Sequence, residues 1–133
     1  MKEYEFIFPM PKPAQTITSS NCRFIDMRWE SGLREYLSNA LFILCPSTWT
    51  YTPEAAMLKS FILNDNVGYF DIKNSFSEDI PNDLGVKLSG DTFIDARKIE
   101  KKIRSSNNNN KGKEFVRKFL DKSENLINIH ILN

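Results

Sequence analysis

The residues that come closest to an enzyme active site are Asp83 and the downstream tripeptide Glu100-Lys101-Lys102. In metal-dependent nucleases, two carboxylates hold a divalent cation and a lysine steadies the attacking water. Such a site needs the Glu-x-Lys tripeptide on a strand, where alternate side chains point into one groove. Here the tripeptide falls in a segment with helical periodicity, in which residues two apart do not face each other. We therefore expect a solvated charged helix face and no enzyme activity.

The other nucleophiles and metal ligands are too few and too scattered to form a recognisable centre. Cys22 and Cys45 lie far apart inside apolar runs, where a free cysteine usually acts as a small buried hydrophobe. The single histidine, His130, has no zinc-ligand spacing to either of them. The five glycines form no phosphate-binding loop. The sequence therefore predicts no metal site and no cofactor.

Charge is distributed unevenly along the chain, and this asymmetry points to partners rather than to a fold. Residues 1–96 contain 8 Lys or Arg against 13 Asp or Glu, whereas residues 97–122 contain 10 against 3. The acids Glu78, Asp79 and Asp83, with Asp91 nearby, are either a solvated loop or a cluster that steers the protein onto a positive cleft. We take them as the first candidates for contact with a protein partner.

The basic C-terminal part offers a different function, the binding of nucleic acid. Its cations could contact phosphates and give a salt-sensitive affinity. No reader motif accompanies them, and no aromatic residues interleave with them outside the apolar stripe, so a solvated helix face is the simpler interpretation. The residues concerned are Arg97, Lys98, Lys101, Lys102, Arg104 and Lys118.

Two aromatic residues, Trp49 and Tyr51, lie in a short polar segment between two predicted helices. Aromatic residues in such a place are either anchors of a protein interface or caps of the core. Both alternatives stay open, and Trp49 and Tyr51 are the second candidates for partner contact.

These candidates must be positioned by elements that the hydrophobic periodicity predicts. Alternation indicates strands over Tyr4–Phe8 and Arg23–Trp29. Helical spacing indicates a helix from Leu33 to Leu44, and a second helix from Thr52 to Ile62 that Asn64-Asp65-Asn66 ends. Val67–Ile72 is expected to be a short strand that leads into the acidic loop.

The second half of the chain contains one ambiguous segment. Residues 86–94 fit either two short strands joined by a Ser-Gly-Asp turn or the early start of a helix, with Thr92 and Asp95 as a capping box. Helices are expected over 95–104 and 114–123, separated by an exposed low-complexity loop at 105–112, and a strand over 126–132. The sequence thus predicts one α+β domain over residues 1–133, with a mixed or antiparallel sheet, strands at both termini and about four helices.

Length and composition fit this prediction. The chain has 133 residues, of which 41% are hydrophobic and 26% charged, near the averages for globular proteins. No stretch approaches the roughly 18 apolar residues of a membrane span. The N-terminal residues carry acids where a signal peptide needs a basic and then an apolar run, so we expect a cytoplasmic protein with no membrane partner.

Three stretches of the sequence carry a family resemblance: Asp26-Met27-Arg28-Trp29, Gly32-Leu33-Arg34-Glu35-Tyr36-Leu37, and the run from Gly85 to Ile99. Over about residues 22–104 the chain resembles the small immunity proteins of bacterial contact-dependent growth inhibition systems. The resemblance implies a non-enzymatic cytoplasmic protein that binds and neutralises the C-terminal toxin domain of a cognate CdiA-type effector. Such toxins are frequently basic nucleases, which an acidic inhibitor surface suits. The resemblance carries over no individual residue.

Overall fold

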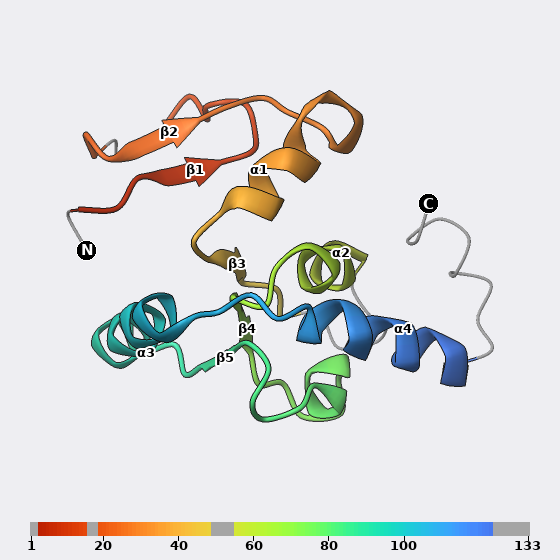
Figure 1. Cartoon of the computed structure of the whole chain (residues 1–133). Helices are drawn as coiled ribbons and strands as arrows, with labels where there is room; N and C mark the ends of the chain where they lie inside the picture. The colour runs from red at the N-terminus through yellow and green to blue at the C-terminus, as the bar shows by residue number, and fades with distance from the viewer. Residues whose placement is uncertain (1–2, 16–18, 49–54, 124–133) are drawn as a thin grey trace. The chain divides into compact units, whose positions relative to one another are not determined.

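The computed structural model describes residues 3–15, 19–48 and 55–123, and these form two compact units, residues 1–36 and 37–133. Strands and helices follow one another along the chain (Figure 1), which confirms the α+β class. The described part contains four α-helices, as predicted. A single domain over residues 1–133 stays a prediction.

The first unit contains a short parallel pair of strands, β1 (Phe6–Phe8) and β2 (Cys22–Phe24). Phe8 lies opposite Phe24, and their rings stack with centroids 4.9 Å apart. Strand β1 falls within the predicted segment, whereas β2 starts one residue before the predicted Arg23 and ends five residues before the predicted Trp29. Pairing with a three-residue partner limits how far the second strand can extend.

After β2 the chain turns through a short 3-10 helix, η1 (Trp29–Ser31). The Ser31 hydroxyl oxygen accepts a hydrogen bond from the Arg28 backbone N–H at 2.8 Å, which closes the turn. Gly32 then adopts a φ of 115°, a left-handed conformation that a side chain would strain. Helix α1 (Leu33–Asn39) follows.

The second unit is built on a three-stranded sheet with the order β3 (Ile43–Cys45), β4 (Val67–Phe70) and β5 (Val86–Leu88). Both strand pairs are parallel. The predicted mixed or antiparallel sheet is therefore wrong. Parallel neighbours need a crossover connection, and helix α2 (Ala55–Leu63) lies in the link between β3 and β4.

The first helix also differs from its prediction, because it ends at Asn39 rather than Leu44 and residues 43–45 form a strand. Two asparagine side chains just after α2 bind the backbone between α1 and β3. The Asn64 amide donates to the carbonyl oxygens of Leu37 and Ala40, and the Asn66 amide donates to that of Leu41. The Ile43 N–H donates to Asn66 O at 2.8 Å and aligns β3 with β4. These contacts satisfy backbone groups that a longer helix would otherwise use.

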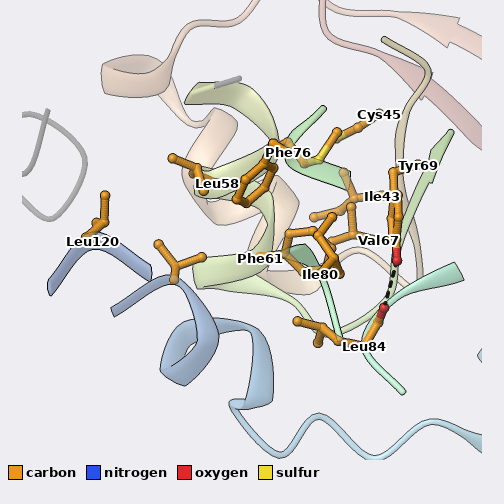
Figure 2. Packing of buried hydrophobic residues seen from close by; sticks show 12 residues of the cluster. Ile43, Cys45, Leu58, Phe61, Val67, Tyr69, Phe76, Ile80, Leu84 and Leu120 are labelled. Atoms are coloured by element: carbon orange, nitrogen blue, oxygen red, sulfur yellow. Dashed lines mark hydrogen bonds between the residues drawn. The ribbon is translucent and has the colours of Figure 1, made fainter. Parts of the chain in front are cut away.

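Helices α2 and α4 (Lys111–Ser123) pack against each other, and in Figure 1 they lie together on one side of the strands, with α3 (Thr92–Ser105) on the other. Phe61 of α2 is fully buried and meets Tyr69 of β4 and Phe115 of α4 edge-on. Figure 2 shows the core between these elements. Its buried members include Ile43, Cys45, Leu58, Phe61, Val67, Tyr69, Phe76, Ile80, Leu84, Val116 and Leu120.

The ambiguous segment 86–94 forms strand β5 followed directly by α3, so the early-helix alternative is correct and the hairpin alternative is wrong. The residue that caps α3 is Asp91 rather than Thr92. Asp95 reaches back instead to Ser89 and Gly90, whose backbone N–H groups donate to its carboxylate at 2.8 Å each. These bonds join the end of the strand to the first turn of the helix.

The predicted loop 105–112 is shorter in the structure, because α3 ends at Ser105 and α4 begins at Lys111. The asparagines at 107–110 are exposed, as expected. The predicted strand Leu126–Leu132 lies outside the described residues. Within the ranges that the structure describes, no helix is long and apolar enough to cross a membrane.

Candidate functional site

The acidic segment (residues 75–83) is anchored to the core of the second unit. It connects β4 to β5 and contains a 3-10 helix, η2 (Phe76–Asp79). Phe76 is buried against Phe119 of α4, with ring centroids 4.8 Å apart, and Ile80 is 3% exposed. Two inward apolar side chains therefore fix the segment at both ends of η2.

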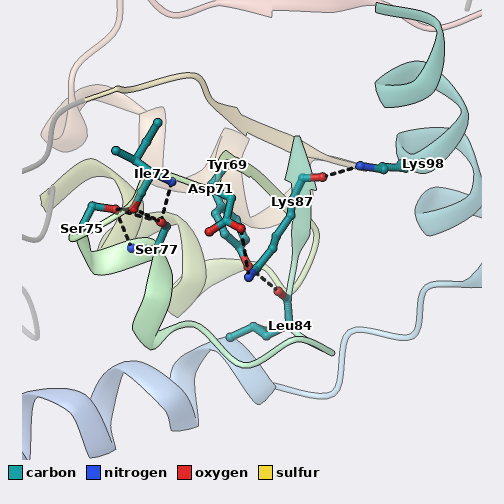
Figure 3. Close-up of polar contacts among 8 residues, drawn as sticks. All are labelled: Tyr69, Asp71, Ile72, Ser75, Ser77, Leu84, Lys87 and Lys98. Carbon is teal, nitrogen blue, oxygen red and sulfur yellow. Dashed lines mark hydrogen bonds and ion pairs between the residues drawn. The ribbon is translucent and has the colours of Figure 1, made fainter. Parts of the chain in front are cut away.

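Two serines secure the start of the segment (Figure 3). The hydroxyls of Ser75 and Ser77 both donate to the Ile72 carbonyl oxygen, at 2.7 and 3.1 Å. The Ile72 N–H donates back to Ser77 Oγ at 2.9 Å, and Ser75 Oγ accepts from Ser77 N–H as the cap of η2. This network fixes the backbone at the start of the acidic segment.

Glu78 and Asp79 lie on the exposed side of the acidic segment. Both are exposed members of the first turn of η2. Within residues 3–15, 19–48 and 55–123, neither carboxylate takes part in any of the ion pairs, which join other residues. These two predicted contact residues are thus adjacent, charged and available to a partner.

Asp83, the third predicted acid, is already engaged. Its carboxylate forms an exposed ion pair with Lys111 Nζ at 3.1 Å. The hydrogen bond from Lys111 is the main reason that the pKa of Asp83 lies below its ordinary value. Asp83 therefore presents a neutralised pair, and it ties the acidic segment to the start of α4.

Asp91 has a structural task at the start of α3. Its carboxylate accepts hydrogen bonds from the backbone N–H groups of Phe93 and Ile94 at 3.0 and 2.9 Å. These are donors that a helix N-terminus leaves unpaired, so Asp91 acts as an N-cap. Trp49 and Tyr51, the predicted aromatic anchors, lie outside the described residues.

Parallel sheets often bind ligands at the carboxyl ends of their strands. Near these ends in the second unit, the polar side chains are paired with one another. Asp71 follows β4 and pairs with Lys87 of β5 at 3.5 Å (Figure 3). Burial raises the pKa of Tyr69 to about 12, and the nearby Asp71 charge adds to the effect. A tyrosine that stays protonated at neutral pH, donating to Leu84 O at 3.5 Å, fits a packing role better than acid–base chemistry.

The Glu-x-Lys tripeptide of the nuclease hypothesis falls on a helix, as the periodicity predicts, whereas Asp83 lies in the acidic segment. Glu100 and Lys102 both lie in α3, two positions apart, so they do not share a face. Within the described ranges, no three of the His, Cys, Asp and Glu side chains gather closely enough to hold a metal ion.

Five of the six candidate cations of the basic C-terminal part separate into two groups, and the sixth, Lys102, is half-buried. Lys98 is held by the Lys87 carbonyl oxygen and Asp95, and Lys118 pairs with Glu114 at 2.8 Å. The second group lines one open depression of about 450 Å³ along α3. Its described lining residues are Arg97, Glu100, Lys101, Arg104 and Ser105.

An exposed aromatic residue shares this helix, and the sequence interpretation missed it. Phe93 is 84% exposed and its neighbour Ile94 is 50% exposed. The available signal was the helical wheel: if α3 starts at Thr92, Phe93 falls about 90° from the centre of the apolar stripe of Ala96, Ile99 and Ile103, outside the face that they share. Because the sequence left the first residue of this helix undecided, the exposure of Phe93 was not predicted.

The chain was compared with protein-family models, with curated proteins and with solved structures, and none of the three comparisons gave a match.

Proposed function

We propose that this protein is a binding protein that neutralises a cationic toxin, as the resemblance to contact-dependent growth inhibition immunity proteins implies. Its partner is the C-terminal toxin domain of a cognate CdiA-type effector, with a nuclease as the expected toxin. The protein acts in the cytoplasm and performs no catalysis of its own.

The observation that carries the proposal is the fixed presentation of Glu78 and Asp79. A surface that meets a preformed partner gains affinity when its backbone is already fixed, because less conformational entropy is then lost on binding. Phe76 and Ile80 supply that rigidity from below, through their burial in the core.

The sign of the charge selects the class of partner. A nuclease groove is lined with cations that bind phosphates, and adjacent carboxylates are attracted to the same cations. Glu78 and Asp79 offer this charge without intramolecular neutralisation by the ion pairs of the described residues. We expect the acidic segment to steer association and to occupy positions meant for phosphates.

The test is capture of the toxin domain encoded next to this protein, with the wild type and the double charge reversal Glu78→Lys and Asp79→Lys. Asp83 is left unchanged, because its carboxylate is already paired with Lys111. We expect the double variant to associate with the toxin at least about tenfold more slowly than the wild type at low salt. The difference between the two association rates should decrease as added salt screens the charges.

The matched control is Asp26→Lys with Asp121→Lys, which changes the net charge by the same amount at two exposed positions elsewhere. Circular dichroism spectra must match among all three proteins. Equal rates for the two variants would place the interface elsewhere, and absence of any complex with the wild type would remove the proposal.

A further inference from the structure

The face of α3 turned away from the core combines an aromatic ring with unpaired cations. An α-helix turns roughly 100° per residue, so Phe93, Arg97 and Arg104 fall within an arc of about 40°, with Lys101 about 80° from Phe93. Ile99 lies on the opposite, partly buried side, about 160° from Arg97. We call Phe93, Arg97, Lys101 and Arg104 the α3 stripe.

The cations of the α3 stripe are available to a ligand. Among the residues that the structure describes, none of the ion pairs involves Arg97, Lys101 or Arg104. Other lysines of this region are neutralised, as Lys111 is by Asp83 and Lys118 by Glu114. The open depression along the helix is lined by the three cations of the α3 stripe and one carboxylate, Glu100, so its net charge is positive.

Single exposed apolar residues are common on protein surfaces, so exposure of Phe93 alone would carry little weight. What distinguishes Phe93 is its place at one end of a row of cations spaced about one helical turn apart, roughly 6 Å. Proteins that bind single-stranded nucleic acid combine these same parts: cations that follow the phosphates and an aromatic face on which a base stacks.

We propose that the α3 stripe binds single-stranded nucleic acid, with a base stacked on Phe93 and successive phosphates on Arg97, Lys101 and Arg104. Arginine suits this task because its planar guanidinium makes paired hydrogen bonds to phosphate oxygens. An acidic protein would satisfy the cations equally well, but it would not require an aromatic ring 84% exposed at the end of the row.

The experiment is a fluorescence anisotropy titration of the full chain with labelled 15-nucleotide RNA and DNA single strands of mixed sequence. Three phosphate contacts to a single strand predict a slope of log K against log salt of about −2, because each contact contributes about −0.7. The affinity should thus fall about 20-fold between 50 and 200 mM salt. The two strands show whether RNA or DNA is preferred.

Variants separate stacking from charge. Phe93→Ala should weaken binding about 5- to 100-fold with the salt slope unchanged, whereas Phe93→Tyr, which keeps the aromatic face, should bind like the wild type. Replacing Arg97, Lys101 and Arg104 together by Gln should flatten the slope. The matched control replaces the same number of cations on α4, at Lys113, Arg117 and Lys122, and should leave most of the affinity.

Several outcomes would overturn the proposal. One is the absence of binding at 50 mM salt, and another is a Phe93→Ala variant that binds like the wild type. Equal loss in the α3 and α4 triple variants would indicate unspecific attraction. Tighter binding to a duplex, or to poly-glutamate of equal charge, would indicate a different partner class. The toxin plays no part in these measurements, so their failure and that of the proposed immunity function are separable.

Discussion

The Asp65 carboxylate holds the N-terminus of α4 on the end of α2, and its removal gives the most informative test of the fold. Asp65 is only 5% exposed. Its Oδ1 accepts from Gly112 N–H at 2.7 Å, and its Oδ2 accepts from Asn109 N–H at 2.8 Å and Lys111 N–H at 3.3 Å. Three backbone donors from a distant segment thus depend on one side chain.

The expected cost of Asp65→Ala follows from these bonds. Loss of a helix cap costs about 0.5–2 kcal/mol, and a buried N–H such as that of Gly112 left without an acceptor costs about 1–3 kcal/mol. The two effects overlap, so we expect the free energy of unfolding to fall by about 3 kcal/mol. For a chain of this length the melting temperature should drop by about 12 °C.

The assay is urea unfolding followed by circular dichroism at 222 nm, with native-state hydrogen exchange at Gly112. Asp65→Asn keeps one acceptor oxygen and should lose about half as much stability as Asp65→Ala. Asp91→Ala removes an exposed cap from α3 and should cost about 1 kcal/mol. If the free energy of unfolding of Asp65→Ala lies within about 0.5 kcal/mol of the wild-type value, the carboxylate does not hold α4 in place.

Three further predictions concern packing and pH. Gly112→Ala should destabilise by about 1–3 kcal/mol in urea unfolding although alanine favours helices, because its Cβ would lie 2.2 Å from the Phe61 carbonyl oxygen, whereas Lys113→Ala on the exposed side should be neutral. Phe61→Ala should cost about 3–5 kcal/mol and Phe61→Leu less than half of that, so equal melting temperatures would contradict the packing of this fully buried ring. The hydrogen bonds from Ser89 hold the pKa of Asp95 below its ordinary value, so the stability that this carboxylate adds is present above pH 4 and lost as pH falls through the folded-state pKa. The stability gap between the wild type and Asp95→Asn should therefore shrink between pH 5 and pH 2, and a constant gap would exclude this linkage.

The elements that the sequence alone determined are those whose signals are local. The apolar spacing of Met57, Leu58 and Phe61 predicted α2, and Asn64–Asn66 marked its end, because a 3.6-residue period and polar stop residues act over neighbouring positions. The acidic segment and the basic C-terminal part are likewise visible in the order of the residues.

Helix α1 shows where local pattern fails. Leu41 and Leu44 continue the helical spacing, yet the chain leaves the helix after Asn39 because Asn64 and Asn66 bind the carbonyl oxygens that follow. Those side chains lie more than twenty residues away in the sequence. The parallel pairing of β3, β4 and β5 is equally non-local, since strand alternation is the same in parallel and antiparallel sheets.

The candidate sites divide in the same way. The positions of Glu78, Asp79 and Asp83 in the sequence identified them as one acidic group. Only the tertiary structure showed that Lys111 neutralises Asp83, whereas Glu78 and Asp79 stay available to a partner. The exposure of Phe93 depended on the residue at which α3 begins, and the hydrogen bonds that Asp91 and Asp95 accept from backbone N–H groups decide that start. Residue types fix which charges and rings a chain possesses, whereas contacts between distant segments decide which of them a partner can reach.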